Sequence, residues 1–258
     1  MESVVAGVVL RMTLPLMPET FVVSRDALQR VAVHVVARAS VHATGRIALR
    51  ALPGGFGTTA LGDDVVRVRV ADGLLVREVG PDGESSASAV AIDGASLRTL
   101  AEHARVDLAA DLYVGHDTPP VGDIDKPLSV DATSAIALGV WWTTAAIALD
   151  RVVATAGPGL TPSATRLWPE HFDVALDIAY DAAAPSERRV NLGGSPGDGF
   201  HASPYLYVGP WTADRPGDSD FWNAPFGAVF GSDELRGSDD PVGAAAAFFR
   251  RGLDLLQG

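Results

Sequence analysis

Carboxylates and imidazoles gather in one stretch of the C-terminal half and are the residues best suited to chemistry. Glu170, His171 and Asp173 are near neighbours in the sequence, and Asp198 and His201 follow within the same stretch. An imidazole beside a carboxylate is a common pair for general acid and base catalysis. We therefore take His171, His201 and Asp173 as candidate catalytic residues, with Glu170 or Asp198 orienting an imidazole.

Aromatic and amide side chains in the same stretch suit the walls of a pocket. Alternation along a strand places Tyr205 and Tyr207 on one face, and it places His171 and Asp173 on one face of another strand. If these faces meet, they form a pocket for a small molecule. The candidate ligand-binding residues are Trp168, Glu170, Asp198, Tyr205, Tyr207, Trp222 and Asn223.

A purely structural interpretation explains the same residues and stands beside the functional one. A half-exposed antiparallel strand also has a polar face, and tyrosines and loop tryptophans commonly serve packing. A metal held by His171 and His201 is the least favoured interpretation, because two histidines without a spaced third ligand are a weak signal. We expect no metal, and the sequence does not identify a cofactor.

The segment Gly193-Gly194-Ser195-Pro196-Gly197 has the spacing of the nucleophile elbow of serine hydrolases. Pro196 argues against that function, because the residue after the nucleophile must donate a backbone N–H to the oxyanion hole. The same glycines lack the Lys-Ser/Thr ending of a phosphate-binding loop. We expect a turn here.

Composition excludes several classes of function. The chain has no cysteine, which removes thiol nucleophiles, disulfides and iron–sulfur clusters. A net charge of −12 disfavours nucleic acid and anionic membranes as partners. The apolar run at residues 4–10 follows Glu2 rather than the positive charge of a signal peptide, so we expect a strand there and a cytoplasmic protein.

The spacing of apolar residues and the positions of turn-forming residues predict the helices and strands of the N-terminal half. Ser24 is the expected N-cap of a helix that reaches about Ala39, and a strand is expected at residues 46–52. The glycine-rich segment 54–57 is expected to be a turn anchored by Phe56. The other expected elements are a hairpin at 65–79, a polar loop at 80–88, and a helix capped by Asp93 or Ser96 that ends near residue 104.

The C-terminal half is expected to begin after an irregular, proline-rich segment at residues 116–127. Asp131 caps a helix that ends near Ala154 and is apolar nearly all round, which indicates a buried helix with Trp141 and Trp142 in the core. Strands are expected at 171–180, 189–192, 205–208 and 226–230, and a last helix is capped by Asp239 or Asp240.

These elements predict an α+β fold with antiparallel sheets, helices packed on one side and one central buried helix. We expect a single compact domain over residues 1–258, with a subdivision into 1–115 and 131–258 that allows two similar halves.

Three motifs resemble those of a bacterial family known only as a domain of unknown function. They are Trp168-Pro169-Glu170-His171-Phe172-Asp173-Val174-Ala175, Ser195-Pro196-Gly197-Asp198, and Pro204-Tyr205-Leu206-Tyr207. The family is similar in carrying W-P-x-H-F-D-L-A, then S-P-G-D, then proline and aromatic residues. The resemblance implies a shared fold and carries over no activity, cofactor or catalytic residue. The richness in alanine, valine and arginine suggests a GC-rich, actinobacterial source.

Two classes of function remain open. The first is a small-molecule enzyme of the hydrolase or isomerase type, with His171 or His201 as acid or base. The second is a non-catalytic module that binds a ligand or assembles with a protein. The sequence does not decide between them, and it does not set the oligomeric state.

Overall fold

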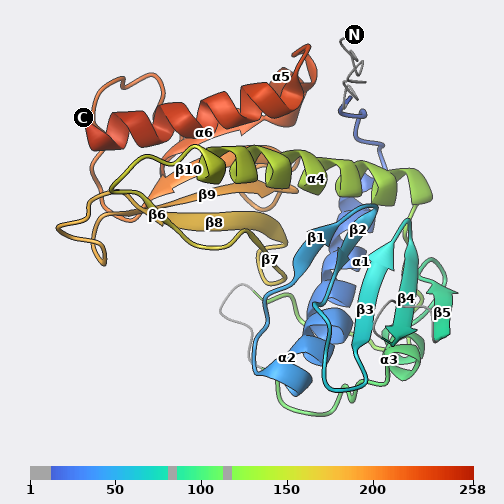
Figure 1. Cartoon of the computed structure of the whole chain (residues 1–258). Coiled ribbons are helices and arrows are strands. Elements are labelled where there is room, and N and C mark those ends of the chain that lie inside the picture. The colour runs from blue at the N-terminus through green and yellow to red at the C-terminus, as the bar shows by residue number, and fades with distance from the viewer. Residues whose placement is uncertain (1–12, 81–85, 113–117) are drawn as a thin grey trace, which may run out of the picture.

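The computed structural model of the chain describes residues 13–80, 86–112 and 118–258. These residues form two antiparallel sheets with helices packed against them, which confirms the α+β class (Figure 1). The strand expected at residues 4–10 lies outside the described residues.

The first helical segment is longer than expected and begins earlier. It consists of α1 (Phe21–Val31), a π-helical stretch η1 (Ala32–Ala37) and α2 (Arg38–Thr44). The predicted cap was wrong: Thr20 occupies the N-cap position, while Ser24 lies inside α1 and its Oγ accepts a hydrogen bond from the backbone N–H of Asp131 at 3.0 Å. The helix ends at Gly45, whose φ of 70° is favourable for glycine.

The first sheet is a meander in which neighbours in sequence are neighbours in space. The expected hairpin is confirmed as β3 and β4. Two predictions were wrong, because residues 55–57 form a strand rather than a turn, and residues 86–88 belong to a strand rather than a loop. Its strands are β1 (Arg50–Leu52), β2 (Gly55–Gly57), β3 (Val66–Ala71), β4 (Leu74–Val79) and β5 (Ser86–Ala91). Helix α3 (Leu97–Ala104), capped by Ser96, packs on it.

The second sheet has the order β11-β10-β9-β8-β6, with β7 also paired to β8. Four of its strands, β8, β9, β10 and β11, confirm expected ones with shifted ends, while β6 and β7 were not expected. Its strands are β6 (Thr161–Pro162), β7 (Arg166–Trp168), β8 (Asp173–Ala179), β9 (Arg189–Ser195), β10 (Tyr205–Pro210) and β11 (Ala228–Gly231). From β8 to β11 this sheet is also a meander, but β6 and β7 both pair with β8, an arrangement that the first sheet does not have.

Helix α4 (Ala132–Ala154) is the central helix that the sequence predicts. Asp131 caps it by accepting the backbone N–H of Ser134 at 2.8 Å, and Trp141 and Trp142 are fully buried. It contacts β1 and β2 of the first sheet and β8 and β9 of the second. Among the described residues it is the one helix long and apolar enough to cross a membrane, but 61% of its apolar window is buried, as in the core of a soluble protein.

The second sheet has one covered face and one open face. Helices α4 and α6 (Pro241–Gln257, capped by Asp240) cover the first face (Figure 1), and α5 (Ser232–Arg236) precedes α6. The packing is close, since a Cβ built on Gly194 would lie 2.6 Å from that of Ala145. Alternation directs the polar residues of β8, β9 and β10 to the opposite face.

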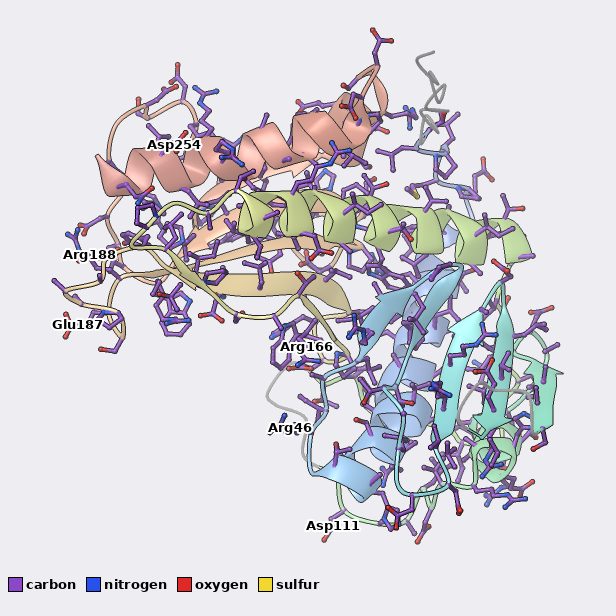
Figure 2. All side chains as sticks on the ribbon, in the orientation of Figure 1. Arg46, Asp111, Arg166, Glu187, Arg188 and Asp254 are labelled. Carbon is purple, nitrogen blue, oxygen red and sulfur yellow. The ribbon has the colours of Figure 1, made fainter. Side chains whose placement is uncertain are left out.

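An aromatic cluster joins the two halves. Phe56 of β2, Trp142 of α4 and Phe172 before β8 make mutual edge-to-face contacts with centroids 4.7 to 5.6 Å apart. Charged side chains point outward around this core, as Figure 2 shows for Glu187, Arg188 and Asp254.

Candidate functional site

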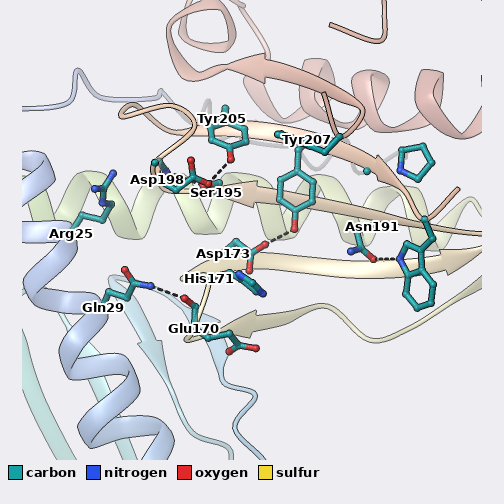
Figure 3. Close-up of a pocket in the computed structure, with 16 residues that line it drawn as sticks. Arg25, Gln29, Glu170, His171, Asp173, Asn191, Ser195, Asp198, Tyr205 and Tyr207 are labelled. Carbon is teal, nitrogen blue, oxygen red and sulfur yellow. Dashed lines mark hydrogen bonds between the residues drawn. The ribbon is translucent and has the colours of Figure 1, made fainter. Parts of the chain in front are cut away.

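A cavity of about 770 Å³ lies between helix α1 and the open face of the second sheet (Figure 3). Its volume is in the range of small-molecule sites. Strands β8, β9 and β10, the loops at their ends and α1 supply its lining. The lining residues are Arg25, Gln29, Glu170, His171, Asp173, Asn191, Ser195, Gly197, Asp198, Gly199, Tyr205, Tyr207, Gly209, Pro210, Trp211 and Phe226.

A carboxyl–phenol pair lies at the floor of the cavity. Asp173 is only 5% exposed, and its Oδ2 accepts a short hydrogen bond from the hydroxyl of Tyr207. Its Oδ1 is buried and has no hydrogen-bond partner within the part of the chain that the structure describes. Burial raises the pKa of Asp173, while the hydrogen bond from Tyr207 and the charge of His171 oppose that rise.

Tyr207 reaches Asp173 because the strand between them carries a glycine. Gly193 of β9 is paired with Tyr207 on one side and with Ala175 on the other. A Cβ built on Gly193 would lie 2.5 Å from the Tyr207 hydroxyl, so the phenol ring lies across a position where any side chain would collide with it. Burial and the adjacent Asp173 raise the pKa of Tyr207 well above its ordinary value, so it stays a donor.

A tight turn before β8 presents His171 and Asp173 to the cavity. Helix α1 holds one side of it, since Gln29 Nε2 donates to the Glu170 carbonyl oxygen at 2.8 Å (Figure 3). Helix α4 holds the other side, since Trp142 Nε1 donates to the Phe172 carbonyl oxygen at 3.1 Å. Phe172 has a φ of 59°, a strained value for a bulky residue that the buried aromatic cluster maintains.

A second carboxyl–phenol pair borders the cavity but is fully occupied. The hydroxyl of Tyr205 donates to Asp198 Oδ2 at 2.6 Å. Asp198 Oδ1 accepts the backbone N–H groups of Phe200 and His201 at 2.8 and 3.2 Å. Burial raises the pKa of Tyr205, and the hydrogen bond to Asp198 adds to the rise. This pair shapes the loop after β9 rather than offering a free carboxylate.

Ser195 and Arg25 have structural partners. Ser195 Oγ accepts the backbone N–H of Gly197 at 3.1 Å. The turn expected over residues 193–197 was wrong in its first part, because Gly193, Gly194 and Ser195 pair as the last residues of β9. The guanidinium of Arg25 donates to Asp26 Oδ1 at 2.7 Å and to the Ala202 carbonyl oxygen at 3.1 Å. The positive charge of Arg25 is therefore already paired, and it holds α1 against the loop after β9.

Two exposed aromatic residues lie at the cavity. Trp211 is 56% exposed and Phe226 is 37% exposed. The indole Nε1 of Trp211 donates to Asn191 Oδ1 at 2.8 Å, and the guanidinium of Arg189 lies 5.4 Å from its ring centroid. These contacts fix the orientation of an exposed ring.

The structure brings together most of the residues that the sequence singled out. Those that line the cavity are Glu170, His171, Asp173, Asp198, Tyr205 and Tyr207. His201 does not join His171 there; it lines a neighbouring cavity of about 300 Å³, and its Nδ1 lies 2.8 Å from the Ser203 carbonyl oxygen.

The remaining expected site residues also lie outside the large cavity. Asn223 bonds the backbone of Val229 through both its amide atoms, and Trp222 packs on Phe221 with centroids 4.9 Å apart. Trp168 ends β7 and does not line the cavity. Trp222 and Asn223 lie on a loop, whose direction the strand pattern does not set, and Trp168 lies on a strand that was not expected.

The cavity also contains residues that sequence reasoning missed. Arg25 and Gln29 come from α1, whose polar positions were not considered as part of a site. Asn191 was predictable, because it lies two residues from Gly193 on the same face of β9. Trp211 and Phe226 follow β10 and precede β11, and their approach depends on loop geometry.

Within the described residues, no group of three or more histidines and carboxylates is close enough to hold a metal ion. Comparison of the chain with protein-family models, curated proteins and solved structures finds no match. The resemblance to a bacterial family therefore stays a prediction, and the chemistry of the cavity carries the functional argument.

Proposed function

We propose that the protein is a small-molecule enzyme of the hydrolase or isomerase type, in which Asp173 transfers a proton to or from a ligand in the cavity. The observation that carries the proposal is the buried carboxyl group of Asp173, which has one oxygen bonded to Tyr207 and the other without a described partner. Buried polar atoms normally have partners, so an open oxygen at a cavity suits a ligand.

The environment of Asp173 suits a general acid. Desolvation raises the pKa of Asp173 and so favours its neutral, proton-bearing form. Tyr207 donates to Oδ2 and therefore stabilises the carboxylate that forms when the proton leaves. His171 is exposed at the same cavity and close enough to affect Asp173 electrostatically, so it is the second candidate for proton transfer.

The alternative is a module that binds a ligand without chemistry, and one observation favours it. Asp198 and Arg25 are both fully engaged with protein groups, which leaves a small number of groups for catalysis. Both proposals use the same cavity, so the test must separate binding from turnover.

The test compares Asp173→Asn with a matched control, Asp177→Asn. Asp177 also belongs to β8, but it pairs with Arg189 and lies outside the cavity. In a turnover screen of ester, lactone, amide and glycoside substrates, Asp173→Asn should lower the rate by about 100-fold or more, the usual contribution of an acid or base. Asp177→Asn should retain the rate. Turnover that survives in Asp173→Asn would refute the role of this carboxyl group.

A second readout does not need a substrate. The infrared spectrum near neutral pH should contain the C=O band of a protonated carboxylic acid, and Asp173→Asn should remove it. If the wild-type band is absent, Asp173 is ionised and cannot act as the acid.

The proposal also covers the cellular location of the protein and the class of its partner. We place the protein in the cytoplasm of a bacterium, as the lack of cysteine and the composition suggest. The net charge of −12 favours a small molecule over nucleic acid or an anionic membrane as its partner.

A further inference from the structure

Exposed aromatic side chains lie in and beside the lining of the cavity. Trp211 and Phe226 line it, and Phe200, 49% exposed, packs edge-to-face on Phe226 with centroids 5.1 Å apart. Single exposed apolar side chains are normal on a protein surface, but several gathered at a cavity indicate a ligand with an apolar face.

The polar groups of the cavity favour an uncharged ligand. An anion would need a free cation, but the guanidinium of Arg25 is paired with Asp26. A cation would need a free carboxylate, but Glu170 already has a partner within the chain and Asp198 accepts three hydrogen bonds. Burial favours the neutral form of Asp173, the third carboxyl group of the lining. The amide of Asn191 and the hydroxyl of Tyr207 add neutral groups.

The site also extends beyond one pocket. Tyr205 lines both the large cavity and the neighbouring one of about 300 Å³, and Phe200 lines the second. The ring of Phe200 lies 5.8 Å from that of Tyr205. Two adjoining hollows on one sheet face, with aromatic rings between them, suit a ligand made of consecutive rings.

We propose that the ligand is a neutral oligosaccharide whose sugar rings lie on Trp211 and on the aromatic residues Phe226 and Phe200. A sugar ring has an apolar C–H face and a polar hydroxyl edge, which matches exposed rings beside neutral hydrogen-bonding groups. The inference rests on the proposed function, because it names the substrate class of the same cavity.

Trp211 has a matched control in Trp222. Both indoles donate through Nε1 and both lie beside an arginine, since the guanidinium of Arg215 is 5.6 Å from the Trp222 ring centroid. Trp222 does not line either cavity. A Trp222→Ala variant therefore removes a similar ring from a site that no ligand of the cavity would touch.

The experiment measures binding of maltotriose, cellotriose, xylotriose and chitotriose at millimolar concentration by calorimetry, with spermidine and inorganic phosphate as charged comparators. At least one trisaccharide should bind more tightly than its monosaccharide and the charged comparators. Trp211→Ala should weaken that binding by about tenfold, equivalent to ~1.4 kcal/mol, and Trp222→Ala should not change it. Because Trp211 is exposed, its replacement should leave the fold intact, and circular dichroism checks this.

Three results would overturn the inference: no trisaccharide binds, a charged comparator binds more tightly, or Trp211→Ala binds as the wild type does. Asp173→Asn separates the two proposals, because it should still bind the trisaccharide but lose turnover. If another substrate is turned over through Asp173 and no saccharide binds, the ligand class fails and the enzyme proposal stands. If a saccharide binds without any Asp173-dependent turnover, the enzyme proposal fails and the ligand class stands.

Discussion

His34 is a buried histidine of the π-helical stretch η1, and its Nε2 lies 2.9 Å from the Pro119 carbonyl oxygen. Burial lowers its pKa below the ordinary 6.5, with the nearby charges of Arg38 and Arg30 adding to the decrease. The folded protein therefore binds a proton at His34 less readily than the unfolded chain does.

This shift predicts a dependence of stability on pH. The contribution of His34 is fully present above the unfolded pKa of about 6.5 and is lost as the pH falls through the lower folded pKa. His34→Gln should therefore reduce the loss of stability between neutral and mildly acidic pH, measured by urea unfolding across that range. His42→Gln, at an exposed position of α2, is the control and should leave the wild-type slope unchanged. An unchanged slope in His34→Gln would refute the prediction.

At the scale of elements, helix α4 holds the turn before β8 through Trp142, while its neighbour Trp141 only packs. The indole of Trp142 donates to the Phe172 carbonyl oxygen, whereas the Trp141 Nε1 is buried without a partner among the described residues. The two adjacent residues have the same type and the same burial. They differ in this hydrogen bond and in the aromatic cluster, to which Trp142 belongs.

Replacement by phenylalanine should therefore have unequal effects on stability at Trp141 and at Trp142. Both Trp→Phe changes leave unfilled space in the core, but Trp142→Phe also leaves a buried carbonyl oxygen without its donor, which costs about 1–3 kcal/mol. Trp142→Phe should therefore lower the free energy of unfolding by about that much more than Trp141→Phe, as measured by urea denaturation. Equal losses would mean that the hydrogen bond does not stabilise the turn.

Elements that depend on local pattern could be predicted from the sequence, and those that depend on distant partners could not. The N-cap at Asp131 and the alternation that points Asp173 and Tyr207 to one side are local, and both are present. Gly57 was assigned to a turn, yet it pairs with Arg69 in a strand, so closely that a Cβ on Gly57 would lie 2.6 Å from that of Arg69. His201 and Trp222 lie on loops, whose course is set by contacts that no sequence period encodes.

At the scale of the whole molecule, α4 is shared by both sheets, and this predicts a single unfolding transition. All five tryptophans lie after residue 131, so their fluorescence reports on the C-terminal half, while far-UV circular dichroism reports on both halves. The unfolding transitions followed by fluorescence and by circular dichroism should therefore have the same midpoint in a urea titration. Separate midpoints would show that the halves unfold independently and that the boundary near residues 116–127 divides true domains.

The cavity also belongs to this scale, because α1 from one half and the open sheet face from the other enclose it. Sequence reasoning located the polar residues on the sheet but not the helix that covers them. Arg25 and Gln29 are separated from Glu170 by most of the chain, and only the packing of the halves brings them together. A site of this kind exists only when both halves are folded.

The position of α4 in the chain has a consequence for synthesis on the ribosome. The helix leaves the ribosome after the first sheet but before any strand of the second sheet has emerged. Until residues 161–210 follow, the face of α4 that will cover the second sheet has no partner, although α4 is apolar enough to resemble a membrane-spanning helix. The nascent chain therefore passes through a stage at which the apolar face of α4 is exposed and prone to aggregation.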